Sequence, residues 1–174
     1  MEQREYKIKK GLLFPLGADA FLLLCLVMIS TMVNGSALET ALFTVFFMPA
    51  MYLFLESLLR RVTIDEGGIS IRRLFGRKRL PWESITHVGG LIIKGKAYIL
   101  LTTVIGFYII SNAYDRFPLL TEDILSHIGS ERVEDEARSL IENTPAGIAG
   151  AALAWVAAIL MTGIVILKIY PFIP

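Results

Sequence analysis

Three strongly apolar stretches constrain this chain more than any other feature of its sequence. They run from residue 12 to 33, from 37 to 59 and from 146 to 168, and the third contains no charge before Lys168. A helix needs about 20 apolar residues to cross the hydrocarbon core of a bilayer. Each stretch therefore predicts a membrane-spanning helix.

Turn-forming residues separate the first two stretches. Only Asn34, Gly35 and Ser36 lie between them, so segment 12–59 predicts a tight antiparallel hairpin of transmembrane helices. A cleavable signal peptide is a weaker interpretation of the first stretch. The stretch is longer than the apolar region of a signal peptide, and a second span follows at once.

Lysine and arginine gather on one side of the predicted spans. The tail 1–11 carries four of them and segment 60–79 carries seven, whereas the turn at 34–36 has none and the third span ends with only Lys168. Cytoplasmic loops of membrane proteins carry such an excess of positive charge. We therefore expect the N-terminus and the segment between the second and third spans inside. The turn and the tail 169–174 are then outside.

Segment 60–130 has no long apolar stretch and instead contains short runs in which apolar and polar residues alternate. Val62 and Ile64 alternate with polar residues, and further apolar runs follow up to Ile110, separated by turn signals. Six or seven short strands of this kind are typical of an antiparallel meander that closes toward a barrel. We expect Trp82 in its core.

Two helical patterns follow the strands. One apolar stripe predicts a helix that packs on them: Phe117, Leu120, Ile124 and Ile128. Asp115 is the expected N-cap of that helix. Segment 131–145 predicts an amphipathic linker helix that lies along the membrane surface or the domain and leads into the third span.

An antiparallel β domain finished by one helix is the architecture of pleckstrin-homology (PH) domains. The chain resembles the bacterial PH-like domain of small membrane proteins at residues 62–69 (VTIDEGGI) and 80–85 (LPWESI), and segment 107–128 is similar too. The resemblance implies an α+β PH-like domain, an antiparallel β-barrel or sandwich with a C-terminal helix, at the cytoplasmic face of a bacterial inner membrane. It implies a non-enzymatic module and names no ligand, because PH-like folds host many unrelated binding roles.

The most informative polar feature is a cluster of cations around a predicted turn at Phe75-Gly76. Its members are Arg72, Arg73, Arg77, Lys78 and Arg79. Beside a membrane, each cation contributes about 1 kcal/mol of attraction to anionic lipid headgroups. The alternative is a solvated hairpin whose charges only set the topology. The spacing does not reproduce the phosphoinositide-binding pattern of eukaryotic PH domains, so we transfer no such specificity.

Small residues mark the third span. They are Gly147, Gly150, Ala151, Ala154 and Ala158. Three of them, Gly150, Ala154 and Ala158, follow one another at four-residue steps, a spacing that lets helices approach closely. The pattern predicts association with a partner membrane protein or a second copy, or else packing against the first two spans of the same chain.

Three acids lie in or near the apolar stretches: Asp19, Glu39 and Glu56. Glu39 and Glu56 lie near span ends and are expected to reach the interface. Asp19 is the most interior, and intramembrane acids are often functional. If the first helix begins at Pro15, however, Asp19 is simply an acid of its first turn.

No catalytic or metal-binding pattern is present in the sequence. His87 and His127 have no second histidine or cysteine at ligand spacing, and Cys25 is the only cysteine. No phosphate loop, dinucleotide fingerprint or nucleophile motif occurs either. We therefore expect no enzyme and no cofactor, and the net charge of +1 provides no field that would attract nucleic acid.

The sequence as a whole predicts a three-span inner-membrane protein that presents a cytoplasmic PH-like domain. Binding or scaffolding is the expected role, toward a partner protein, anionic lipid headgroups or its own oligomer. An accessory subunit of a larger membrane complex is the alternative. A small transporter is disfavoured, because the spans contain few polar groups.

Overall fold

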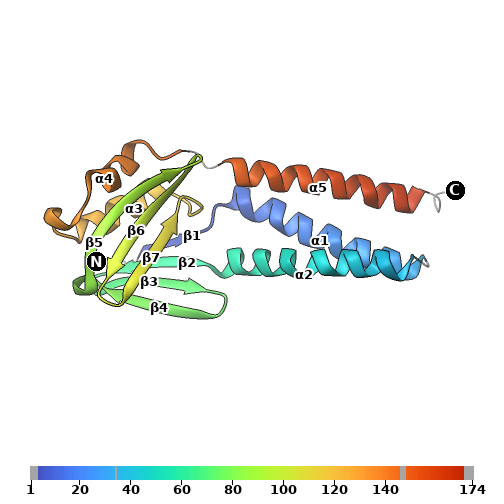
Figure 1. The fold of residues 1–174 in the computed structure, drawn as a ribbon, viewed down its shortest axis with the longest axis horizontal. Coiled ribbons are helices and arrows are strands. Elements are labelled where there is room, and N and C mark those ends of the chain that lie inside the picture. Colours follow the sequence, from blue (N-terminus) through green and yellow to red (C-terminus); the bar gives the residue numbers. More distant parts are fainter. Residues whose placement is uncertain (1–3, 34, 146–147, 171–174) are drawn as a thin grey trace. The chain divides into compact units, whose positions relative to one another are not determined.

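The computed structural model describes residues 4–33, 35–145 and 148–170, and the chain forms two compact units (Figure 1). The first unit, here called the β domain, combines the N-terminal segment up to Lys9 with residues 59–148. The second, here called the helical unit, combines residues 10–58 with the chain from Ala149 onward. The β domain is therefore interrupted in sequence by the predicted hairpin of spans.

The β domain contains two antiparallel sheets within the described residues. The first has the order β1-β2-β3-β4, built from β1 (Arg4–Lys7), β2 (Arg61–Asp65), β3 (Gly68–Arg73) and β4 (Gly76–Pro81). The second has the order β5-β6-β7, built from β5 (Ile85–Ile93), β6 (Lys96–Thr103) and β7 (Gly106–Ser111). A short 3₁₀ helix, Trp82–Ser84, joins them. The ladders of the described strands do not close into the expected barrel, so the domain is a two-sheet structure.

The strands form where apolar residues alternate with polar ones. In β2, Val62 and Ile64 are buried while their neighbours are partly exposed, as expected for a strand with one face in the core. β5 runs unbroken through Gly89-Gly90, although this pair resembles a turn signal in the sequence. A Cβ atom at Gly90 would lie 2.5 Å from the backbone nitrogen of Ala137. The glycine thus admits the close approach of a helix and does not end the strand.

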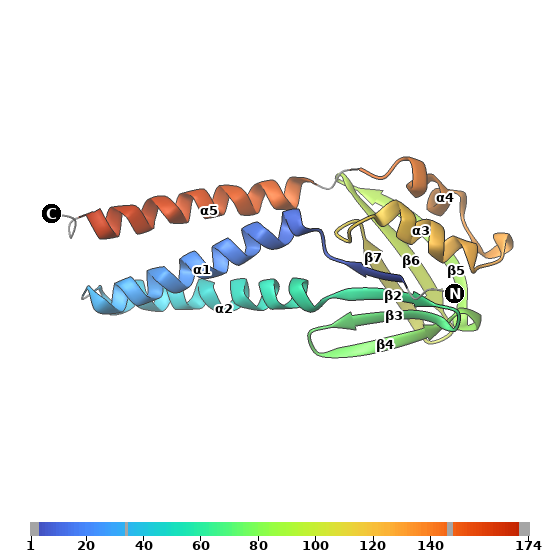
Figure 2. The same cartoon turned by 180° about the vertical axis from the view of Figure 1, so that it is seen from behind.

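The N-terminal segment contributes a strand that the sequence patterns did not reveal. β1 pairs with β2 along its whole length, with Lys7 opposite Arg61, and the view from behind shows the two strands side by side (Figure 2). Arg4 and Tyr6 also contact Asp123 of the helix that follows the sheets. The expected tail 1–11 is therefore partly a structural element of the domain.

Helices complete the domain as the apolar stripe predicts. α3 (Phe117–Ser126) buries Phe117, Leu120 and Ile124 almost completely. Ile128, the fourth residue of the predicted stripe, is also buried but lies two residues beyond the end of the helix. Asp115 does not cap it: Arg116 occupies that position with φ 50°, and the amide of Asp115 donates to the carbonyl of Lys7. The second helical region is a 3₁₀ turn, Ser130–Arg132, followed by α4 (Asp135–Glu142), which packs on β5 and α3.

Trp82 lies at the margin of the domain, which corrects the expectation that it belongs to the core. Its side chain is half-buried, and the indole stacks on the ring of His127, with ring centroids 4.5 Å apart. The indole nitrogen donates to the carbonyl of Asp65 at 3.0 Å. The N–H of a tryptophan that is partly shielded from water usually finds such an acceptor, and the end of β2 provides one here.

The helical unit consists of α1 (Lys10–Met32), α2 (Ala37–Leu59) and α5 (Ile148–Ile169). Within the described residues, these three helices are long and apolar enough to cross a membrane. Gly35 donates its amide to the carbonyl of Ser30 at 2.8 Å, and the Ser36 hydroxyl accepts from the amide of Glu39 at 3.2 Å. These bonds end α1 and begin α2, as the turn-forming sequence predicts.

Candidate functional site

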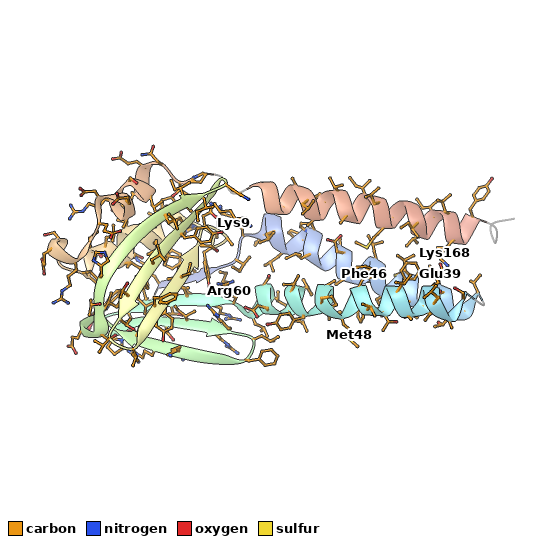
Figure 3. The ribbon with its side chains drawn as sticks, in the orientation of Figure 1. Lys9, Glu39, Phe46, Met48, Arg60 and Lys168 are labelled. Carbon is orange, nitrogen blue, oxygen red and sulfur yellow. The ribbon has the colours of Figure 1, made fainter. Side chains whose placement is uncertain are left out.

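A four-residue loop after β7 ties together the three points at which the β domain continues into the helices. We call residues 112–115 the junction loop and the end of the domain that contains it the exit end. The loop's hydrogen bonds are Asp115 N to Lys7 O (2.7 Å), Lys9 N to Ala113 O (2.9 Å), Arg60 Nε to Tyr114 Oη (3.1 Å) and Asn112 Nδ2 to Pro145 O (2.9 Å). Figure 3 shows Lys9 and Arg60 at this end of the domain. The loop therefore holds the chain one residue before α1, one residue after α2 and three residues before α5.

The junction loop is itself well anchored. Tyr114 and Asn112 are buried, at 1% and 4% exposure. The Arg60 guanidinium also lies over the Tyr114 ring, 5.6 Å from its centroid. Because one aromatic ring and its hydroxyl both contact the same arginine, the start of β2 has a defined position on the domain.

The basic hairpin β3–β4 points its turn toward the exit end. Arg72 pairs with Arg61 of β2 on one side and with Arg77 of β4 on the other. The turn at Leu74–Phe75 therefore extends about 7 Å beyond the position of Arg61, at the strand rise of about 3.3 Å per residue. Like charges opposite each other weaken a strand pair, so Arg72 and Arg77 are not placed for stability.

The five predicted cations do not form one face. Arg72, Arg77 and Arg79 share one side of the hairpin, and Arg73 and Lys78 lie on the other, because neighbouring positions along a strand alternate between faces. All five are exposed. Positive charges therefore lie on both faces of the hairpin near its turn.

Their contacts divide the cations further. Arg77 Nε donates to Ser70 Oγ at 2.6 Å, and Lys78 Nζ lies 5.1 Å from the centre of the Tyr108 ring. Arg79 forms an ion pair with Asp65 at 2.9 Å, close to the opposite end of the hairpin. Arg79 is thus neutralised locally, and the candidate site reduces to the four cations nearest the turn. No acid of the described residues is paired with any of these four.

Acidic residues gather at the other end of the domain, here called the distal end. The turn between β2 and β3 carries Asp65 and Glu66, and α3 ends there with Asp123 and the His127–Trp82 stack. Asp123 accepts hydrogen bonds from Arg4 and Tyr6. Burial, together with the Asp123 carboxylate, raises the pKa of Tyr6 to about 12. Two of these distal acids are paired with arginines, Asp65 with Arg79 and Asp123 with Arg4, whereas the four cations at the exit end have no such pairing among the described residues.

The residues that carry the PH-like resemblance contact one another at the distal end. Asp65 Oδ1 accepts from the amide of Gly67 at 2.9 Å, which closes the turn between β2 and β3. Gly68 has φ 145°, and a Cβ atom there would lie 2.1 Å from the carbonyl oxygen of Leu80. Only glycine fits that position. This motif therefore shapes the β2–β3 turn and its packing on β4, and the basic residues lie outside it.

The small residues of the third span lie mostly against the chain's own helices. Ala154 and Ala158 are buried, at 9% and 5% exposure, and Gly150 and Ala151 are half-buried. Gly150 approaches Leu12 of α1, with 4.0 Å between its ideal Cβ position and Leu12 Cδ1. Gly147 lies outside the described residues. The burial favours packing within one chain, and the association with other chains stays a prediction.

The helical unit contains one ion pair that the sequence patterns did not single out. Glu39 of α2 and Lys168 of α5 are labelled in Figure 3. Glu39 Oε1 and Lys168 Nζ are 2.5 Å apart, and Lys168 Nζ lies 5.8 Å from the centre of the Phe43 ring. The expected topology could have indicated this ion pair, because it places Glu39 and Lys168 at the outer ends of their spans. Asp19 is buried in α1, and its Oδ1 has no hydrogen-bond partner among the described residues.

The two histidines have ordinary structural contacts. His87 Nε2 lies 2.7 Å from Glu134 Oε1, and His127 stacks on Trp82. No group of three or more potential metal ligands occurs in the described part of the chain.

Comparison with known proteins identifies part of the β domain. Residues 60–103, which span β2 to β6, match the family model described as Bacterial PH domain. No curated protein and no solved structure matches the chain. The strand order and the helix after β7 agree with the expected PH-like arrangement in general, although the sheets stay separate. Segment 60–103 of the β domain is therefore similar to the bacterial PH domain family, and the chain combines this domain with three long apolar helices among its described residues.

Proposed function

We propose that this protein is a non-enzymatic protein of a bacterial inner membrane whose PH-like domain docks its exit end on anionic lipid of the cytoplasmic leaflet. Docking holds the domain in one orientation, with its distal end directed toward the cytoplasm. The protein then serves as a scaffold that presents the distal end to binding partners. A role as an accessory subunit of a larger membrane complex is the alternative.

One observation carries this proposal: exposed cations surround the β3–β4 turn at the end of the domain from which the chain continues into the apolar helices. Arg61, which pairs with Arg72, is two residues after the end of α2. If α2 crosses the membrane, the chain near Arg61 is at the membrane surface. The turn at Leu74–Phe75 extends beyond that register and meets the headgroup region first.

The cations are suited to orientation more than to anchoring. Arg72, Arg73, Arg77 and Lys78 each contribute about 1 kcal/mol near an anionic surface, or roughly 4 kcal/mol together. The three apolar helices already hold the protein in the bilayer, so this energy is available to select one orientation of the domain. Because exposed charges are screened within about 10 Å at 0.1 M salt, the docked orientation is expected to depend on ionic strength.

The topology is the first point to test. In a Cys25→Ala background, a cysteine at Ser36 should react with a membrane-impermeant maleimide added to intact cells, and a cysteine at Gly76 should react only after the cells are opened. Gly76 accepts a side chain, because no atom lies within 4 Å of its ideal Cβ position. Reaction of Gly76→Cys in intact cells would reverse the orientation and remove the proposed docking surface from the cytoplasm.

Docking itself can be measured with a spin label at Gly76→Cys in the full-length protein. The protein is placed in nanodiscs of phosphatidylcholine with or without phosphatidylglycerol, and collisions of the label with oxygen and with a water-soluble nickel complex are compared. A label in lipid collides mainly with oxygen (lipid-like behaviour), and a label in water collides mainly with the nickel complex (water-like behaviour). We expect lipid-like behaviour with phosphatidylglycerol at low salt and water-like behaviour at high salt. The same water-like result in all conditions would contradict docking and favour a protein partner for the domain.

A charge-neutral variant of the four cations provides the matching comparison. Arg72→Gln, Arg73→Gln, Arg77→Gln and Lys78→Gln together should make the label at Gly76→Cys water-like even with phosphatidylglycerol. Arg79→Gln is the control, because Arg79 is also exposed on the same hairpin but is paired with Asp65. Equal effects of the control and of the fourfold variant would show that charge near the turn has no special role.

A further inference from the structure

A second hairpin reaches the exit end and carries an unusual run of exposed residues. All six residues from Leu91 to Lys96 are exposed, and their sequence is Leu-Ile-Ile-Lys-Gly-Lys. β7 ends at Ser111, opposite Tyr98, so the pair Ile93–Lys96 extends beyond the third strand as a two-stranded ribbon. We call residues 91–96 the β5–β6 tip.

The tip is tied to the chain that leads into α5. The carbonyl of Ala97 accepts from the amide of Asn112 at 2.8 Å, and the Asn112 side chain donates to the carbonyl of Pro145 at 2.9 Å. Ile148, the first residue of α5, is three positions after Pro145, a reach of at most about 11 Å. The tip therefore begins beside the third connection, as the β3–β4 turn begins beside the second.

The chemistry of the tip matches that of a membrane interface. Leu91, Ile92 and Ile93 are 43–48% exposed, which in water leaves a ribbon of apolar side chains uncovered. Lys94 and Lys96 follow at once, and no ion pair of the described residues involves either. Apolar side chains beside cations are the combination that binds at the boundary of headgroups and acyl chains.

The turn of the tip holds a lysine in a conformation that other residues adopt more easily. Lys94 has φ 48° and Gly95 has φ 73°, and two positive φ values in succession are those of a type I′ turn. Asparagine and glycine are the favoured residues at the first of these positions. A lysine there accepts backbone strain and places its charge at the outermost point of the hairpin.

We propose that the β5–β6 tip is a second lipid-contacting element of this domain. The isoleucine side chains enter the interfacial region of the cytoplasmic leaflet, and Lys94 and Lys96 bind the phosphates of anionic headgroups. The proposal rests on the docking of the exit end proposed above and adds to it a point of apolar insertion. Two separate contacts, at the β3–β4 turn and at the β5–β6 tip, restrict rotation of the domain on the surface more than the β3–β4 turn does alone.

The same sheet offers a matched control at its other end. The turn between β6 and β7 carries Val104 and Ile105, each 81% exposed, at the distal end of the domain. This turn is more apolar and more exposed than the β5–β6 tip, but no lysine or arginine lies within it. The β6–β7 turn differs from the β5–β6 tip in its charge and in its distance from the points where the chain continues into the helices. The proposal depends on these two properties.

The experiment compares spin labels at three positions of the full-length protein in nanodiscs that contain phosphatidylglycerol. The labels are attached to Ile93→Cys, Val104→Cys and Gly76→Cys, each in the Cys25→Ala background. We expect lipid-like collision behaviour at Ile93→Cys and water-like behaviour at Val104→Cys. Water-like behaviour at Ile93→Cys with lipid-like behaviour at Gly76→Cys would overturn this proposal alone. Water-like behaviour at both would overturn the docking of the whole exit end.

A substitution that preserves the hairpin tests the headgroup contact. Lys94→Asn removes one charge and introduces a residue that the turn favours, so the fold of the hairpin should be retained. Measured at Ile93→Cys, the ratio of lipid-exposed to water-exposed label should fall about fivefold, the change expected for one cation. An unchanged ratio would overturn the role of Lys94. The ratio in pure phosphatidylcholine should change little, and an equal fall there would contradict recognition of anionic headgroups.

Discussion

Lys7 lies opposite Arg61 in the β1–β2 ladder, although the whole α1–α2 hairpin lies between them in the chain. The two apolar helices are thus an insertion between neighbouring strands of one sheet. Facing residues of an antiparallel pair are about 5 Å apart, so the ladder keeps the start of α1 and the end of α2 close together. The ladder and the junction loop together define where all three helices leave the domain.

The N-terminal strand depends on Tyr6, which leads to the first prediction. Tyr6→Phe removes the hydrogen bond to Asp123 while keeping the buried ring, so the free energy of unfolding should fall by about 1–2 kcal/mol. Thermal unfolding of the full-length protein in detergent, followed by Trp82 fluorescence in a Trp155→Phe background, measures this loss. Tyr98→Phe, on a half-buried tyrosine of β6, should change stability less.

The same residue predicts a pH dependence. The pKa of Tyr6 is raised from its ordinary value of 10.0 to about 12 in the folded protein, because burial and the Asp123 carboxylate disfavour the phenolate. The folded state therefore holds the phenol proton more tightly than the unfolded state does. This contribution to stability is complete below pH 10 and is lost as the pH rises through about 12. Between these values wild type should lose more stability than Tyr6→Phe, and parallel pH profiles would contradict the assignment.

Trp82 joins the β4–β5 corner to the end of α3, and its two contacts can be separated. Trp82→Ala should destabilise the domain by about 2–3 kcal/mol, less than for a fully buried aromatic residue, because the indole is half-exposed. Trp82→Phe keeps an aromatic ring to stack on His127 and loses only the bond to the Asp65 carbonyl, so about 1 kcal/mol is expected. Since these variants lack Trp82, unfolding is best followed by circular dichroism. Equal losses for both variants would assign the whole effect to the hydrogen bond.

The third span provides a test of which helices it packs against. Ala158→Leu should destabilise the helical unit by about 1–3 kcal/mol, because Ala158 is already buried within one chain and a leucine overpacks the contact. Ala152→Leu on an exposed face of α5 is the control and should have little effect. The particle mass in mild detergent should stay that of wild type. A lower mass for Ala158→Leu would show that this residue lies between chains.

The Glu39–Lys168 pair predicts a double-mutant result. Glu39→Lys or Lys168→Glu alone places like charges together at a partly buried site, so each should lower the melting temperature in detergent. The double variant restores opposite charges and should recover most of the loss, with a coupling energy of about 1–2 kcal/mol. Additive effects of the two single variants would mean that the contact contributes nothing to the packing of α2 and α5.

Several elements of this structure follow directly from local patterns in the chain. The long apolar stretches became α1, α2 and α5, because helices are the way in which a single apolar segment satisfies its own backbone. The stripe Phe117-Leu120-Ile124 became the buried face of α3, because residues at this spacing share one side of a helix. Alternation in Val62–Ile71 and the glycines of the turn located the first strands, and the motif around Gly68 pointed to the correct family.

Other elements had no local signal. Arg4–Lys7 is too short and too polar to read as a strand, and it forms β1 only because β2 offers an unpaired edge after the inserted helices. The pair Gly89-Gly90 has the composition of a turn, but its role is to admit the backbone of α4. Arg79 likewise does not belong with the other four predicted cations, because it forms an ion pair with Asp65. The two residues come together only after β2, β3 and β4 have paired.

The sequence by itself determined the presence of three apolar helices, a PH-like domain between the second and third, and a basic hairpin, because these depend on periodicity, length and charge within short segments. The tertiary structure decided that the basic hairpin and the β5–β6 tip both reach the end of the domain where the helices connect. That arrangement depends on strand register and on the hydrogen bonds of residues 112–115 to Lys7, Lys9, Arg60 and Pro145. Contacts between residues so far apart in the chain form only when the sheets and α3 pack together, and no local pattern encodes them.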